Sequence, residues 1–281
     1  MRNSTSSALA PQGHPTVVEA GIEFLTSEVE RPFAYARGAL PGAEGETARF
    51  APHVVRIADV RAGRPLHLDE HGAMLGSWPT LVRRFYDESH VRQRYYPESA
   101  EIIRAALRAD RVVVFDHNVR RGTVRPLQPS WHAVGQPVFH AHTDYTPRSA
   151  LRRLREELGP QAEQRASRYM QVNLWRPIRG PVRDAPLALC DGSSVTPGAL
   201  RTVELRYPDR TGEIYYLMHE SKQRWYFASD MGVDEAWLFK NFDSGSPGPG
   251  SVAPHSAFTD PRHRTVLPRE SIEVRALAIF H

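Results

Sequence analysis

Cysteine and lysine are nearly absent from this chain of 281 residues, and long apolar runs are missing altogether. The single cysteine, Cys190, cannot form a disulfide within the chain. It also cannot build a cysteine-ligated zinc or iron–sulfur site, so histidine and carboxylate side chains must hold any metal. No apolar run approaches the roughly 20 residues that a membrane helix needs. The first residues lack the apolar segment of a secretory signal, and a lone cysteine suits a reducing compartment, so we expect a cytoplasmic protein without membrane contact.

Lysine accounts for only two of the 36 basic residues, and the other 34 are arginines. The formal net charge is +4, yet the arginines are scattered and form no long basic run. No platform of interleaved aromatic and basic residues stands out, so we expect no nucleic-acid partner. Arginine binds carboxylates in a bidentate manner better than lysine does, which makes single arginines candidates for a carboxylate ligand.

Short β-like segments dominate the chain from residue 111 onward. We expect strands at residues 16–25, 53–61, 111–117, 137–145, 169–178, 186–191, 212–220, 224–230, 235–243 and 270–280. We expect helices at residues 78–109 and 147–158, the second beginning after Thr146 and ending at Gly159. Strands do not alternate with helices and no glycine-rich phosphate loop occurs, which argues against a doubly wound α/β fold. The pattern predicts a mainly β chain with flanking helices (α+β), folded as a double-stranded β-helix, the cupin-like jelly roll.

No linker or repeat divides the chain, so we expect one domain over residues 1–281. Within it, residues 1–13 are expected to be a flexible tail. Residues 14–110 should supply strands and helices that pack on a jelly-roll core at residues 111–281.

His142 and Asp144 form the sharpest local feature, an H-x-D tripeptide at the end of an apolar segment. In a strand, residues two apart point to the same face, so the imidazole and the carboxylate would converge. A second histidine would complete a facial triad of two histidines and one carboxylate. Such a triad binds Fe(II) and leaves open positions for a 2-oxoacid and O₂. By itself an H-x-D tripeptide has little specificity.

The distal histidine could be His255, which is followed 14 residues later by Arg269 and then Ser271. On a strand Arg269 and Ser271 share a face and could hold the distal carboxylate of 2-oxoglutarate. Arg275 lies in phase with both and is the second candidate for that carboxylate. Two other histidines remain alternatives as metal ligands. His140 shares the strand face of the H-x-D pair, and His219 competes with His255 for the distal position.

Six blocks of the chain resemble a known family, at residues 114–122, 140–147, 172–191, 223–244, 254–261 and 268–280. The resemblance is to the non-haem iron oxidoreductases that include the small component of the cephamycin methoxylation system and fungal hydroxylase/desaturases. It implies an Fe(II)/2-oxoglutarate-dependent dioxygenase with O₂ as oxidant. Such an enzyme hydroxylates, desaturates or cyclises a small natural product of secondary metabolism by C–H abstraction. The resemblance supports His142, Asp144 and His255 as iron ligands and Arg269 as the co-substrate anchor.

Further polar and aromatic residues are candidates to line the substrate pocket: His117, Arg120, Tyr145, Asn173, Trp175 and Trp225. For each of them a turn, core or solvent-facing role is the competing interpretation, because aromatic residues in β-rich cores usually serve packing alone.

Two other functions fit the same residues. The chain could be an accessory or substrate-binding component of a two-component oxygenase, acting with a partner enzyme. It could also be a cupin-like metal-dependent isomerase or hydrolase, in which Arg269 need not bind 2-oxoglutarate. A homodimer is possible in any of these cases.

Overall fold

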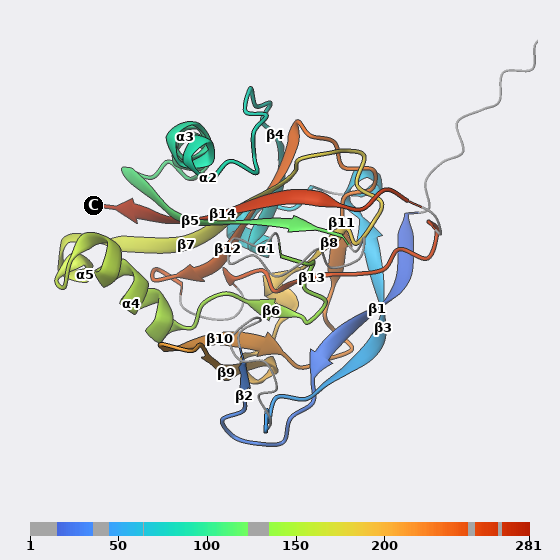
Figure 1. The fold of residues 1–281 in the computed structure, drawn as a ribbon. Helices are drawn as coiled ribbons and strands as arrows, with labels where there is room; N and C mark the ends of the chain where they lie inside the picture. The colour runs from blue at the N-terminus through green and yellow to red at the C-terminus, as the bar shows by residue number, and fades with distance from the viewer. Residues whose placement is uncertain (1–15, 36–44, 64, 123–134, 247–250, 264–265) are drawn as a thin grey trace, which may run out of the picture.

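The structure is a computed structural model, and it describes residues 16–35, 45–63, 65–122, 135–246, 251–263 and 266–281. The tail expected at residues 1–13 therefore lies outside the described residues. The described chain is dominated by two β-sheets that face each other (Figure 1). It is the double-stranded β-helix that the strand pattern predicts.

The larger sheet has nine strands in the described residues. In spatial order the strands are β1 (Val17–Leu25), β3 (Phe50–Asp59), β11 (Trp225–Phe227), β8 (Leu187–Cys190), β13 (His255–Ala257), β6 (His142–Thr143), β10 (Thr211–Leu217), β9 (Leu200–Arg206) and β2 (Phe33–Tyr35). The antiparallel pair of β1 and β3 lies at one edge of the sheet, and β2 lies at the other edge.

The smaller sheet has five strands, all antiparallel to their neighbours. In spatial order they are β4 (Ala73–Ser77), β12 (Glu235–Asp243), β7 (Arg168–Pro177), β14 (Glu270–Phe280) and β5 (Arg111–Arg121). Nearly every residue of β7, β12 and β14 is buried, because one face packs on helices and the other faces the larger sheet.

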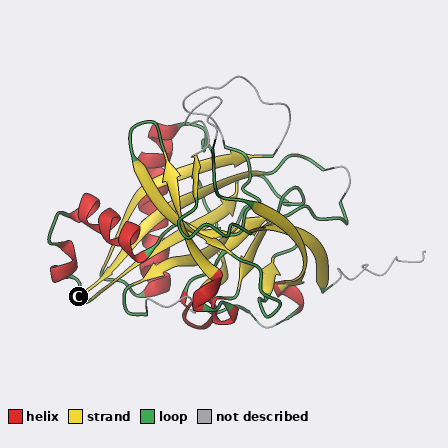
Figure 2. Ribbon diagram, turned by 90° about the horizontal axis from the view of Figure 1, so that it is seen from below, coloured by secondary structure: helices red, strands yellow, loops and turns green. Residues whose placement is uncertain are grey.

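The helices cover the outside of the smaller sheet and one end of the molecule. They are α1 (Leu68–His71), α2 (Glu88–His90), a π-helical turn (Val91–Tyr95), α3 (Tyr96–Leu107), α4 (Pro147–Leu158) and α5 (Ala162–Arg165), with short 3₁₀ turns at Val60–Ala62, Gly192–Ser194 and Pro197–Ala199. Figure 1 shows α3 above β5 and β14, where Ile103 packs against the outward residues Ile272 and Val274. Figure 2 shows most of the helices arranged around the crossing strands. No helix in the described ranges is long and apolar enough to cross a membrane.

Several expected elements are confirmed. The strands at 235–243 and 270–280 coincide with β12 and β14. Helix α4 begins after Thr146, whose side chain accepts a hydrogen bond from the Ser149 amide, and it ends at Gly159 with φ of 95°.

Two expected elements are wrong in extent. The helix expected from residue 78 begins only at Glu88, where the Asp87 carboxylate accepts the His90 amide as a cap. The strand expected at 137–145 is reduced to β6, His142–Thr143. The residues before β6 bond instead to the side of β1, since the Ala141 amide donates to the Glu23 carbonyl. That segment crosses between strands, which an alternating sequence pattern cannot reveal.

Candidate metal centre

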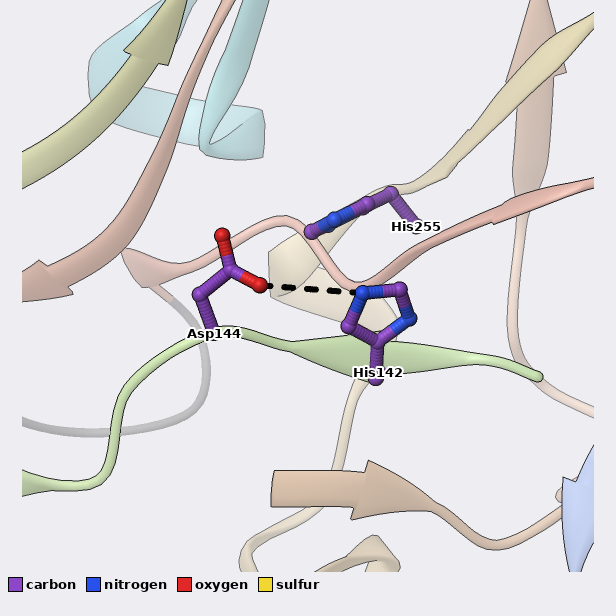
Figure 3. Close-up of side chains that lie close together, drawn as sticks. All are labelled: His142, Asp144 and His255. Atoms are coloured by element: carbon purple, nitrogen blue, oxygen red, sulfur yellow. Dashed lines mark ion pairs between the residues drawn. The ribbon is translucent and has the colours of Figure 1, made fainter. Parts of the chain in front are cut away.

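Strands β6 and β13 bring three potential metal ligands together in the middle of the larger sheet. His142 and His255 are direct partners across the two antiparallel strands, with ring centroids 4.3 Å apart. Asp144 lies two residues beyond His142, and its Oδ1 is 3.7 Å from His142 Nε2 (Figure 3). One ligand atom from each side chain lies within 4.8 Å of the other two. Two imidazoles and one carboxylate that converge on one position form the donor set of a non-haem Fe(II) site.

Each histidine is held by a backbone carbonyl on the side of its Nδ1 atom. His142 Nδ1 is 2.8 Å from the His140 carbonyl oxygen, and His255 Nδ1 is 3.3 Å from that of Ala253. A carbonyl only accepts, so Nδ1 must carry the proton and Nε2 is left as the metal-binding lone pair. Burial, followed by the nearby His255, lowers the pKa of His142 to about 3, and burial also lowers the pKa of His255. Both rings are therefore neutral, as metal ligation requires, at neutral pH.

Asp144 is held by contacts from the opposite sheet. Its Oδ2 accepts hydrogen bonds from Asn173 Nδ2 at 2.8 Å and from Arg275 Nε at 2.9 Å. Its backbone amide donates to Asn241 Oδ1 at 3.0 Å. Burial alone would raise the pKa of this carboxyl, but the Arg275 charge and the Asn173 hydrogen bond help to outweigh it and keep the pKa below the usual range. Asp144 is thus ionised, as a carboxylate ligand must be.

A cavity opens beside both histidines, and Arg269, which directly precedes β14, lines it. The cavity is lined by Arg120, Val138, His142, Trp175, Leu187, His255, Ser256, Ala257, Arg269 and Glu273. The Arg269 guanidinium is 4% exposed, lies 5.5 Å from the Trp175 ring and donates through Nη1 to the Ala185 carbonyl. Its Nε and the Ser271 Oγ have no hydrogen-bond partner among the described residues.

These unpartnered atoms are a test of whether 2-oxoglutarate fits the site. Burial, and after it the charge of Arg120, lower the pKa of Arg269 to about 9. A guanidinium keeps its proton even so, which leaves a buried cation with no carboxylate of the described residues within ion-pair distance of its side chain. A carboxylate of the co-substrate would supply the missing acceptor for Arg269 Nε and for Ser271 Oγ. Two of the three candidate metal ligands, His142 and His255, therefore share one cavity with the buried cation Arg269.

The other metal and co-substrate candidates lie elsewhere. His140 stacks on Phe50, with ring centroids 3.8 Å apart, and its Nε2 is 2.7 Å from Glu23. His219 stacks on His53 near β3. Neither belongs to the cluster of three ligands. Arg275 faces inward from β14, as its phase predicts, but it contacts Asp144 rather than the lining of the cavity.

The residues expected to line a substrate pocket fall into two groups. Arg120 and Trp175 line the cavity. Asn173 binds Asp144, and Tyr145, whose pKa is raised to about 12 by burial, packs near α4. The remaining two residues point away from the cavity.

His117 and Trp225 are those two residues. His117 Nδ1 is 2.9 Å from the Tyr96 hydroxyl of α3, on the outer face of the smaller sheet. Trp225 is 1% exposed and packs on Phe24 in the core of the larger sheet.

The sequence interpretation missed two residues at this site. Asn241, on β12, fixes the Asp144 amide. Glu273, 6% exposed, lines the cavity between the two arginines of β14. A polar residue within a strand that is otherwise apolar was the signal available in each case, since buried polar groups need a partner or a function.

Comparisons with known proteins agree with this geometry. A family model described as "Oxidoreductase/YMDC permease-like domain" matches residues 22–279. The Fe(II)/2-oxoglutarate-dependent dioxygenase nvfI of Aspergillus novofumigatus is 33% identical over 84% of this chain and 87% of its own length. The chain belongs to the family of Fe(II)/2-oxoglutarate-dependent dioxygenases and fungal hydroxylase/desaturases.

Other members of this dioxygenase family align over similar spans. The hydroxylase/desaturase efuI of Hormonema carpetanum is 30% identical over 85% of this chain and 88% of its own length. The solved structure of the iron and alpha-ketoglutarate-dependent endoperoxidase NvfI matches with a TM-score of 0.83 at 28% identity. That match covers 94% of this chain and 98% of the other. The chain is accordingly a non-haem iron dioxygenase with a jelly-roll fold.

Proposed function

We propose that this dioxygenase hydroxylates, desaturates or cyclises a small natural product, with iron on His142, Asp144 and His255 and 2-oxoglutarate on Arg269 and Ser271. The observation that carries the proposal is the unpartnered buried Arg269 Nε on the cavity that His142 and His255 also line, with an unpartnered Ser271 Oγ two residues further along the chain. The relatives' names support the reaction class, since they include dioxygenases, hydroxylase/desaturases and an endoperoxidase.

The chain's own residues would act by binding and orientation. His142 and His255 present Nε2 to the metal because their Nδ1 atoms are held by backbone carbonyls. Bound Fe(II) would supply activation of O₂ coupled to oxidation of the 2-oxoacid. Arg269 would fix the distal carboxylate by charge and Ser271 by a hydrogen bond, which sets the 2-oxo end toward the triad. Arg120 and Trp175, on the same cavity, are our candidates to contact the substrate.

Anaerobic reconstitution tests this proposal. Purified protein is loaded with Fe(II), and 2-oxoglutarate is then added while the visible spectrum is recorded. We expect a weak charge-transfer band in the wild type and none in Asp144→Ala, which lacks the carboxylate ligand. Absence of the band in the wild type would count against the proposal.

Turnover in air distinguishes the alternatives. We expect the chain alone to release succinate when a suitable natural product is present. An absolute need for a second protein would favour an accessory role. Turnover that survives in Arg269→Met without 2-oxoglutarate would favour a metal-dependent isomerase or hydrolase.

A further inference from the structure

Four neighbouring strands of the smaller sheet each contribute one polar side chain to a network around Asp144, which directly follows β6. Asn173 of β7 and Arg275 of β14 donate to its carboxylate. Asn241 of β12 accepts from its backbone amide, and Asp116 of β5 binds Arg275. Strands β7, β14 and β5 are in register at this level, because Arg275 pairs with Asn173 on one side and with Asp116 on the other.

The strand register of the smaller sheet shifts at two places beside these side chains. The register shifts between Lys240 and Phe242, which places Asn241 at a bulge. It shifts again between Arg275 and Ala276, opposite β5. Bulges re-aim side chains and are frequent next to active sites. Here one bulge lies at Asn241, which accepts from the Asp144 backbone amide, and the other follows Arg275, which donates to the Asp144 carboxylate.

The two oxygens of Asp144 have different surroundings. Oδ2 accepts from Asn173 at 2.8 Å and from Arg275 Nε at 2.9 Å, so both of its lone-pair directions are occupied. Oδ1 faces His142 Nε2 at 3.7 Å and is the oxygen turned toward the other ligands. The Arg275 guanidinium is in turn anchored, with Nη1 3.1 Å from Asp116 Oδ2 and Nη2 3.6 Å from Glu273.

We infer that Arg275 and Asn173 are positioning residues that restrict Asp144 to one metal-binding oxygen, Oδ1. A carboxylate free to rotate can chelate a metal through both oxygens, which would leave room for a bidentate 2-oxoacid but would occupy the position needed by O₂. Holding Oδ2 keeps that position open. The inference builds on the metal centre of the proposed function and assigns Arg275 a role different from that of Arg269.

The test measures Mn(II) binding without O₂ or 2-oxoglutarate, by calorimetry on the full chain. Arg275→Met removes both the charge and the Nε donor, and Asn173→Leu removes the other donor. We expect each variant to bind Mn(II) about 10- to 100-fold more weakly, the range found for residues that orient metal ligands. With saturating Mn(II), we expect Arg275→Met to bind 2-oxoglutarate within about twofold of the wild type.

Arg262→Met is the matched control. Arg262 has a side chain that is 20% exposed, as Arg275 has, and it binds a buried aspartate, Asp260. It lies outside the lining of the metal cavity. We expect its loss to change Mn(II) affinity by less than about twofold, so that an effect of Arg275→Met cannot be ascribed to breaking any buried ion pair.

Crystal structures with Mn(II) report the coordination directly. The wild type should bind the metal through one Asp144 oxygen and Arg275→Met through both. Unchanged Mn(II) affinity in both variants, or chelation through both oxygens in the wild type, overturns the inference. Loss of 2-oxoglutarate binding alone in Arg275→Met would also overturn it, because Arg275 would then be a co-substrate anchor.

Arg275→Lys replaces Arg275→Met if the latter fails to fold. Lysine keeps the positive charge but cannot reach Asp144 and Asp116 together, so the same loss of Mn(II) affinity is expected. A wild type that binds Mn(II) through Oδ1 but never binds 2-oxoglutarate would refute the proposed function and leave the positioning role in place.

Discussion

Two buried arginines six residues apart, Arg269 just before β14 and Arg275 in the middle of it, differ in whether they are paired with a carboxylate. Arg275 contacts Asp144, Asp116 and Glu273, and these acids raise its pKa well above the ordinary value despite burial. Arg269 has no carboxylate within ion-pair distance and an unpartnered Nε among the described residues. A paired charge fixes geometry inside the protein, whereas an unpaired one is available to a ligand from outside.

Removing the partner of the paired arginine should have the largest effect on stability. Asp144→Ala leaves the Arg275 cation with more distant or more exposed acids, so we expect unfolding of the metal-free chain to require about 3–5 kcal/mol less. Urea denaturation measures this. Asp116→Ala is the control, because Asp116 is 45% exposed and its pair should contribute at most about 1 kcal/mol. Equal stability of Asp144→Ala and the wild type would mean that the pair contributes nothing.

Removing the unpaired arginine should stabilise the metal-free chain rather than destabilise it. Arg269→Met replaces a buried, incompletely bonded cation by an apolar side chain of similar length, so we expect the free energy of unfolding of the metal-free chain to rise by about 1–3 kcal/mol. The same variant should bind 2-oxoglutarate at least about 30-fold more weakly, since truncating one partner of a buried charge pair costs about 2 kcal/mol or more.

The control for this variant is again Arg262→Met, whose arginine is paired and whose loss should destabilise the chain. Destabilisation by Arg269→Met with unchanged 2-oxoglutarate affinity would contradict the proposed difference between the unpaired Arg269 and the paired Arg275.

The sequence predicts the phase of β14 but not the partners of its residues. Arg269 lines the cavity and Arg275 reaches Asp144 on the side of the larger sheet, as period-two alternation requires. Which arginine is already paired depends on Asp144 and Asp116, from segments 131 and 159 residues away. No local pattern carries that information.

The H-x-D tripeptide is a second example of this limit. Its ligand role is suggested by local spacing, but His255 became its neighbour only through the pairing of β6 with β13. Likewise the two bulges beside the site break the alternation on which strand predictions rest. Fold class and core strands could therefore be predicted, and the contacts around Asp144 could not.

Acid should destabilise the metal-free site through His142. Its pKa is about 3 in the folded chain and 6.5 in the unfolded one, so the unfolded chain binds more protons between these values. Stability therefore falls as pH drops from 6.5 toward 3. Between pH 7 and 5, we expect the wild type to lose about 1–2 kcal/mol more than His142→Gln, which cannot take up this proton. Parallel pH profiles of the two proteins would show that the buried ring does not resist protonation.

The smallest effect should come from the outer face of β5, where His117 meets α3. Tyr96→Phe removes the hydroxyl that lies 2.9 Å from His117 Nδ1 and changes nothing on the inner face, where Arg120 lines the cavity. We expect a loss of about 0.5–1.5 kcal/mol in unfolding free energy, with Mn(II) and 2-oxoglutarate affinities within about twofold of the wild type. Urea denaturation and calorimetry measure both. A large loss of 2-oxoglutarate binding in Tyr96→Phe would show that the two faces of this strand are coupled, because the outward hydrogen bond would then be holding Arg120 and its neighbours in place.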